Sequence, residues 1–95
     1  MNDVPISTFE KAILATHHAK AKFLTREKVK DTFMGDTVWE GEVLVFDLEG
    51  HPTARLCYAW EVDGQVTAVL GEGPVKSAKL AVRAAIAAEA VADRP

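Results

Sequence analysis

The chain has 95 residues, a formal net charge of −3, and a composition that is 48% hydrophobic and 26% charged. This length fits one domain, residues 1–95, and the balance of apolar and charged residues excludes a disordered chain. The acidic net charge argues against a surface built mainly for nucleic acid. A single cysteine, Cys57, and the lack of a long apolar run predict a cytoplasmic protein that does not enter a membrane.

The first expected element is a helix that begins at Ile6, after a loose arm at residues 1–5. Phe9 and Ile13 recur at helical spacing, so they are expected on the face of this helix that packs into the core. His17 lies at the border of that face, where a histidine is more often a solvated residue than a ligand.

Residues 23–37 support two interpretations. Apolar residues recur there with the period of a strand, but lysine and glutamate are frequent enough for a helical extension, and both alternatives stay open. The residues that follow are plainly typical of β-structure, and Asp63-Gly64 predicts a two-residue hairpin turn. We expect strands at residues 39–48, 54–62 and 66–70.

Residues 71–92 give the strongest helix prediction in the chain. The segment is rich in alanine, the best helix former. Gly73 is the expected cap and Pro74 suits the first helical position, because its missing N–H would have no partner there.

The predicted fold class is α+β, with two helices packed on one face of a three- or four-stranded antiparallel sheet in the order α-β-β-β-α. The other face of the sheet is expected to remain open. The expected core consists of Phe9, Ile13, Leu44, Phe46, Leu56, Tyr58, Trp60, Val82 and Ile86.

Three short motifs stand in the second half of the chain: Gly50-His51-Pro52, Val62-Asp63-Gly64 and the run GEGPVKSAK at residues 71–79. With the element order, they resemble the double-stranded-RNA-binding domain over residues 43–88. The resemblance implies two helices on one sheet face and contacts to duplex RNA from the start of the last helix. Two departures weaken the implied RNA contacts: the histidine precedes the proline, and the family's paired lysines are reduced to Lys76.

The candidate nucleic-acid contacts are Lys76, Lys79 and Arg83 on one stripe of the last helix, and His51 in the loop between two strands. A basic stripe at a helix start can bind phosphates. A solvated edge of an otherwise apolar helix is the simpler interpretation.

No catalytic, metal-binding or cofactor-binding residue is expected. Adjacent histidines such as His17 and His18 diverge by about 100° on a helix, so they cannot bind one metal from the same face. Cys57 stands in mid-strand without a histidine at a recognisable spacing, so it is interpreted as a structural thiol. We expect no enzyme activity and no cofactor.

A half-apolar surface on the open sheet face is the candidate protein interface. Its expected members are Val43, Val45, Arg55, Cys57, Ala59, Thr67 and Val69. The preferred hypothesis is a small non-catalytic protein-interaction module whose partner is a second copy of the chain or one other protein. The alternative hypothesis is weak binding of double-stranded RNA.

Overall fold

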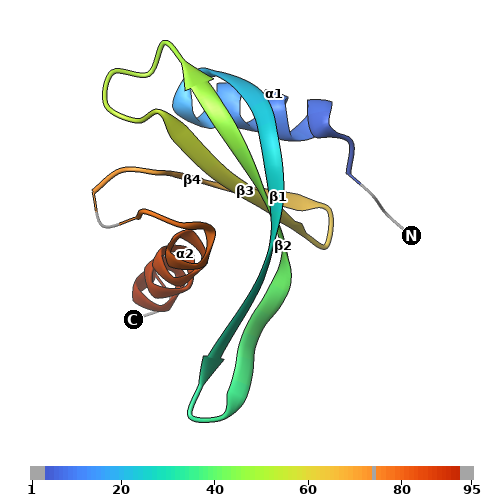
Figure 1. The fold of residues 1–95 in the computed structure, drawn as a ribbon, viewed down its shortest axis with the longest axis vertical. Helices are drawn as coiled ribbons and strands as arrows, with labels where there is room; N and C mark the ends of the chain where they lie inside the picture. The colour runs from blue at the N-terminus through green and yellow to red at the C-terminus, as the bar shows by residue number, and fades with distance from the viewer. Residues whose placement is uncertain (1–3, 74, 93–95) are drawn as a thin grey trace.

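The computed structural model describes residues 4–73 and 75–92. Four strands form one antiparallel sheet in the order β1-β2-β3-β4, with one helix before them and one after them (Figure 1). This arrangement confirms the α+β class, with four strands among the described residues. The elements are α1 (Ile6–His17), β1 (Lys20–Phe33), β2 (Asp36–Glu49), β3 (Leu56–Val62), β4 (Gln65–Leu70) and α2 (Ala78–Ala92).

The uncertain residues 23–37 belong to a long hairpin. Strand β1 pairs with β2 from Lys20 to Phe33, which excludes the helical extension. Helix α1 ends because His18 adopts the left-handed conformation, with φ of 55°, and its N–H donates to the Leu14 carbonyl at 2.9 Å. Such a left-handed residue is a common way to end a helix.

Both tight hairpins use two turn residues with positive φ. The predicted Asp63-Gly64 turn is confirmed, with φ of 52° and 82°. The β1–β2 turn lies at Met34-Gly35, with φ of 54° and 86°. Turns of this kind match the right-handed twist of the flanking strands.

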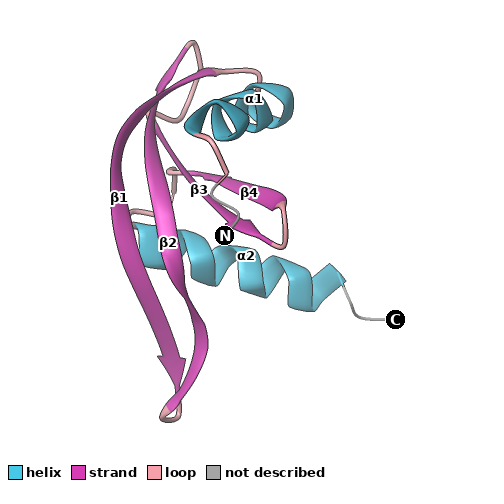
Figure 2. Cartoon of the chain, turned by 90° about the vertical axis from the view of Figure 1, so that its right-hand side faces the viewer, coloured by secondary structure: helices cyan, strands magenta, loops and turns pink. Residues whose placement is uncertain are grey.

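The two helices cover opposite faces of the sheet, so the expectation that both pack on one face is wrong. Phe9 and Ile13 of α1 pack on the face that carries Leu44 and Phe46, which we call face 1. The opposite face, face 2, carries Val43, Val45, Tyr58 and Trp60, and it packs against Ala78, Ala81 and Val82 of α2. Figure 2 shows the β3–β4 hairpin between the two helices.

The strand register explains this arrangement. Leu44 pairs with Ala59 and Val45 pairs with Tyr58, and directly paired residues share a face. The expected core placed Leu44 on the same face as Tyr58, which the register contradicts. Residues 43–46 and 57–60 are all buried, as in strands that are covered on both sides.

Most of the predicted core is buried, but it forms two clusters instead of one. Phe9, Ile13, Leu44 and Phe46 belong to the face 1 cluster. Tyr58, Trp60 and Val82 belong to the face 2 cluster. Leu56 is half-buried, and Ile86 is 37% exposed, so Ile86 is not a core residue.

Helix α2 begins at Ala78, later than the predicted start near residue 74. The Ser77 hydroxyl oxygen accepts a hydrogen bond from the Leu80 N–H at 3.2 Å, which makes Ser77 the N-cap. Gly73, the expected cap, has φ of 61° in the preceding loop, and Pro74 lies outside the described residues. Over residues 4–73 and 75–92, neither helix combines the length and the hydropathy that crossing a bilayer requires.

Candidate functional site

The β1–β2 hairpin extends beyond the rest of the sheet. Pairing between β2 and β3 covers only residues 44–47 of β2, whereas β2 remains paired with β1 from Glu49 to Asp36. We call hairpin residues 27–43 the arm, which projects away from the β3–β4 hairpin in Figures 1 and 2. The last residues of β3 diverge from the arm and stay paired only with β4.

A groove of about 460 Å³ lies where the arm and β3 diverge, on the α2 side of the sheet. The rings of Trp39 and Trp60 meet there edge to face, with centroids 5.9 Å apart. Two aliphatic side chains at the groove remain exposed, Val62 at 49% and Ile86 at 37%. The lining consists of Trp39, Trp60, Val62, Asp63, Gln65, Thr67, Val82, Ala85 and Ile86.

An ion pair joins α2 to the arm beside this groove. The Nε and Nη2 atoms of Arg83 each lie 3.0 Å from Oδ1 of Asp31. The Asp31 side chain is only 7% exposed, whereas the Arg83 side chain is 52% exposed. Arg83 therefore compensates a buried carboxylate, which reduces its availability for a phosphate.

The other predicted nucleic-acid contacts do not gather around Arg83. Lys76 and Lys79 are exposed, Lys76 in the loop before α2 and Lys79 in its first turn. His51 lies in the β2–β3 loop, where its Nδ1 accepts hydrogen bonds from the N–H groups of Thr53 at 3.1 Å and Ala54 at 3.0 Å. These two bonds make His51 a structural residue of its own loop.

That loop is tied to the loop that precedes α2. The Thr53 hydroxyl donates to a Glu72 carboxylate oxygen at 2.6 Å. Next to this contact, the Gly71 N–H donates to the carbonyl of Leu56, the first residue of β3, at 2.8 Å. The polar groups near His51 therefore hold two loops together.

The residues predicted as an open protein interface do not share one surface. Val43 and Val45 are buried beneath α2, whereas Cys57 and Ala59 are buried on face 1. Arg55 is exposed in the loop before β3. Val69 packs half-buried against the face 2 cluster, and Thr67 lines the groove. The expected open sheet face is therefore corrected: each face of the sheet has a helix on it.

Cys57 occupies a site unsuited to nucleophilic chemistry. The residue is fully buried, and burial raises its pKa from the ordinary 9.0 to about 12, while a backbone hydrogen bond involving Val69 lowers it to a lesser extent. The thiol is therefore protonated at neutral pH, whereas a nucleophilic cysteine needs the thiolate. Among the described residues, no three His, Cys, Asp or Glu side chains lie close enough together to bind a metal.

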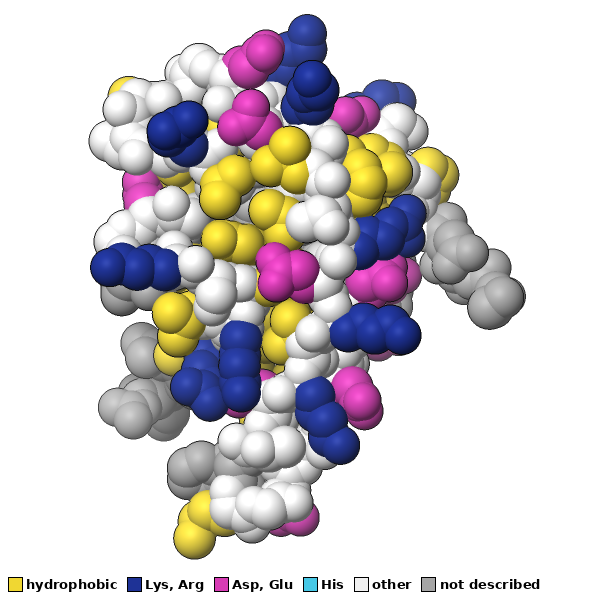
Figure 3. Space-filling model, viewed as in Figure 1, with side chains coloured by type: hydrophobic (Ala, Val, Ile, Leu, Met, Phe, Trp, Pro, Cys, Tyr) yellow, Lys and Arg dark blue, Asp and Glu magenta, His cyan; other side chains and the backbone are white. Residues whose placement is uncertain are grey.

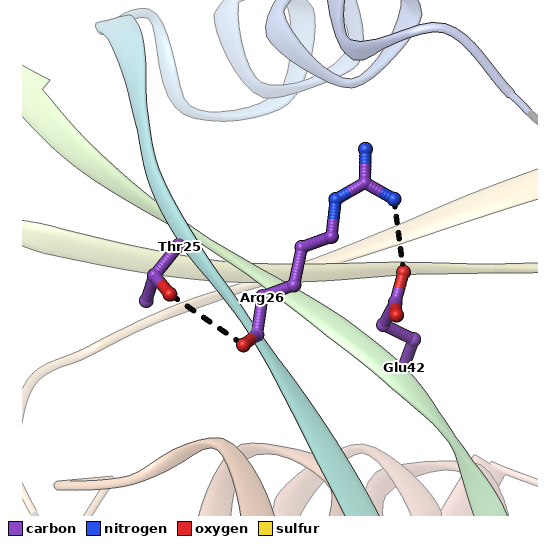
Figure 4. Close-up of polar contacts among 3 residues, drawn as sticks. All are labelled: Thr25, Arg26 and Glu42. Atoms are coloured by element: carbon purple, nitrogen blue, oxygen red, sulfur yellow. Dashed lines mark hydrogen bonds and ion pairs between the residues drawn. The ribbon is translucent and has the colours of Figure 1, made fainter.

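The side of the arm turned away from α2 carries alternating charges. Lys28 pairs directly with Glu42, and Lys30 pairs with Glu40. Arg26 donates from Nη1 to Oε1 of Glu42 at 3.0 Å (Figure 4). Basic and acidic side chains intermix around the lower hairpin, below a group of apolar side chains (Figure 3).

Comparisons with known protein families, with curated proteins and with solved structures found no match for this chain. The element order and the antiparallel sheet are compatible with the double-stranded-RNA-binding fold. The placement of the helices on opposite faces differs from what that resemblance implied.

The sequence analysis missed the groove. It placed Trp39 at the start of a strand without a role, Trp60 in the core and Val62 at the end of a strand. The predicted strands at residues 39–48 and 54–62 are nearly equal in length, so they did not indicate it; in the structure β2 has 14 residues and β3 has 7, so β2 extends beyond β3. The side chains at such an extension lack a neighbouring strand to cover them.

Proposed function

We propose that this chain is a small non-catalytic protein-binding module and that it contacts its partner through the groove. The observation that supports this proposal is the pair of tryptophans beside the exposed Val62 and Ile86 in a single depression. Aromatic side chains are enriched at the centres of protein interfaces, where they fill or form pockets.

The chemistry of the groove lining favours binding over catalysis. Asp63 is its one ionisable side chain, beside the uncharged Gln65 and Thr67. A catalytic site usually joins a nucleophile or an acid to a second polar group that activates it. The one thiol, Cys57, is buried on the other face of the sheet.

A photo-crosslinking experiment tests the proposal. A benzophenone amino acid replaces Gln65 in the groove or, as a control, Lys11 on α1, and both positions are exposed. We expect protease-sensitive adducts in cells from position 65 at a level well above those from position 11.

A matched pair of blocking variants locates the contact. Val62→Glu introduces a charge into the groove, whereas Leu14→Glu introduces one on α1. The two side chains are similarly exposed, Val62 at 49% and Leu14 at 54%. Val62→Glu should abolish the adducts and Leu14→Glu should leave them unchanged. Adducts that persist in Val62→Glu, or equal adducts from positions 65 and 11, would refute the proposal.

Binding of double-stranded RNA remains the second candidate, supported by the exposed Lys76 and Lys79 near the start of α2. Two phosphate contacts would give a log–log salt dependence with a slope of roughly −2. The test is a fluorescence titration at low salt with an RNA of about 20 base pairs. This length exceeds the footprint of about 16 base pairs that a double-stranded-RNA-binding domain covers. Absence of binding, or equal binding by Lys76→Glu/Lys79→Glu, would exclude this function.

A further inference from the structure

We propose that the groove binds an extended basic segment of a partner protein, which adds as a strand to the free edge of β2 in the arm. This inference rests on the proposed function and specifies the conformation and the charge of the partner. It follows from three independent features: the strand pairing, the placement of apolar side chains and the placement of carboxylates.

The strand pairing leaves a backbone edge without a neighbour. The β2–β3 ladder ends at the pair Leu44 and Ala59, and residues 36–43 of β2 are paired only with β1. Half of the peptide groups of this segment therefore point away from β1, toward the space beside the groove. An extended peptide can satisfy such groups with its own N–H and C=O groups, as in strand addition to other sheets.

The side chains next to this edge suit an alternating sequence. Trp39 and Gly41 are two residues apart, so both lie on the groove side of the arm. A Cβ atom on Gly41 would lie 2.9 Å from Cη2 of Trp39, which shows that the indole lies over the glycine. Every second side chain of an added strand would therefore point toward the groove beside the indole rings, which favours an apolar residue at those positions.

The intervening side chains of the added strand would face carboxylates. Glu40 and Glu42 are exposed on the other side of the arm, where Glu42 also accepts a hydrogen bond from Arg26. Cross-strand neighbours of opposite charge stabilise a sheet, so lysine or arginine is favoured at these positions. At the far end of the groove, Asp63 lies in the β3–β4 turn and forms no ion pair with any residue that the structure describes.

The same charges argue against a second copy of this chain as the occupant. Two arms that paired through this edge about a two-fold axis would bring an acidic strand against an identical strand. Glu40 and Glu42 would then face carboxylates, and like charges across strands are destabilising. The net charge of −3 acts in the same direction. An alternating basic and apolar segment from another protein avoids this repulsion.

Tryptophan fluorescence of the whole chain provides the assay, because the chain has two tryptophans and both line the groove. The probe is a synthetic peptide of alternating lysine and valine, compared with the same peptide N-methylated at alternate residues. A third peptide has glutamate in place of lysine. We expect saturable changes in emission with the first peptide and at least tenfold weaker binding of the other two.

Variants of the protein test the charge contacts. Glu40→Gln and Asp63→Asn should each weaken binding of the lysine peptide by threefold or more, and Asn suits the positive φ at residue 63. Glu10→Gln on α1 removes the same charge at a residue outside both the arm and the groove lining, and it should have no effect.

The outcomes separate this inference from the proposed function. Equal binding of the methylated and unmodified peptides would refute strand addition, and equal binding of the acidic peptide would refute the charge preference. Light scattering that shows a dimer, with no peptide bound, would overturn the inference in favour of a second copy. If crosslinking from position 65 is blocked by Val62→Glu and none of the peptides binds, the inference fails while the proposed function stands. If the lysine peptide binds but position 65 gives no adducts, the groove accepts an extended basic segment in vitro, and the proposed function in cells is refuted together with the partner that the inference assigns.

Discussion

Replacement of Arg83 by methionine should destabilise the fold, because it leaves the Asp31 carboxylate buried without its cation. Loss of one partner of a fully buried ion pair costs about 3–5 kcal/mol. Here the carboxylate is 7% exposed but the guanidinium is 52% exposed, so water can partly replace the cation. We therefore expect a cost of about 2 kcal/mol, which lowers the melting temperature of a domain of this size by roughly 8–16 °C.

Urea unfolding followed by circular dichroism measures this cost, and two further variants serve as comparisons. Asp31→Leu/Arg83→Met removes both charges, and its free energy of unfolding should lie within about 1 kcal/mol of the wild-type value. Glu42→Gln removes the carboxylate of the Arg26–Glu42 pair. This pair has the same 3.0 Å distance, but its carboxylate side chain is 42% exposed. The substitution should therefore lower the free energy of unfolding by at most about 1 kcal/mol. If Arg83→Met cost no more than Glu42→Gln, burial of Asp31 would not determine the energy of the pair.

Three other predictions concern the core and the groove. Trp60→Ala should cost about 3–5 kcal/mol in urea unfolding, because Trp60 is 4% exposed, and an unchanged midpoint would contradict its place in the core. The free energy of unfolding of the wild type, relative to Cys57→Ala, should fall by about 1.4 kcal/mol per pH unit from pH 9 toward 12, since the unfolded chain loses the thiol proton near 9.0 and the folded chain near 12. If the free energy of unfolding had the same pH dependence in both proteins, the thiol would titrate alike in the folded and unfolded chain, which would contradict the prediction. Gly41→Ala should displace the Trp39 ring and shift the tryptophan emission, because the added Cβ would lie 2.9 Å from the ring; an emission spectrum identical to that of the wild type would show that the ring does not lie over residue 41.

Local patterns in the sequence predicted the elements well, and the relation between strands was the part that they could not predict. Asp63-Gly64 specifies its turn by backbone conformation alone. The alternation within β2 and within β3 is also local, but which face of β2 matches which face of β3 depends on register. A shift of one residue exchanges the faces, and the β2–β3 loop does not fix it.

The placement of α2 depended on the same missing information. Both faces of β2 carry valine, leucine or phenylalanine at residues 43–46, and all four residues are buried. This run indicates a strand covered on both sides. The sequence analysis divided this run into a core face and an open face. It therefore interpreted the residues of the face 2 cluster as a partner site, although α2 packs on them.

The candidate site was less predictable than the fold, because it forms where pairing stops. Trp39 and Ile86 are far apart in the chain and come together only because the arm diverges from β3 and α2 crosses beneath it. The Arg83–Asp31 pair likewise joins residues 52 positions apart. Helical periodicity placed Arg83 on a basic stripe but gave no information on its partner.

The covering of each sheet face by a helix from a different end of the chain has a consequence for any chain that lacks its last helix. Helix α1 precedes the strands, so the face 1 cluster can assemble as soon as the sheet forms. Helix α2 follows the strands, and without it the sheet presents Val43, Val45, Tyr58 and Trp60 to solvent or to chaperones. A chain truncated after Gly73 would therefore have one covered sheet face and one exposed apolar face.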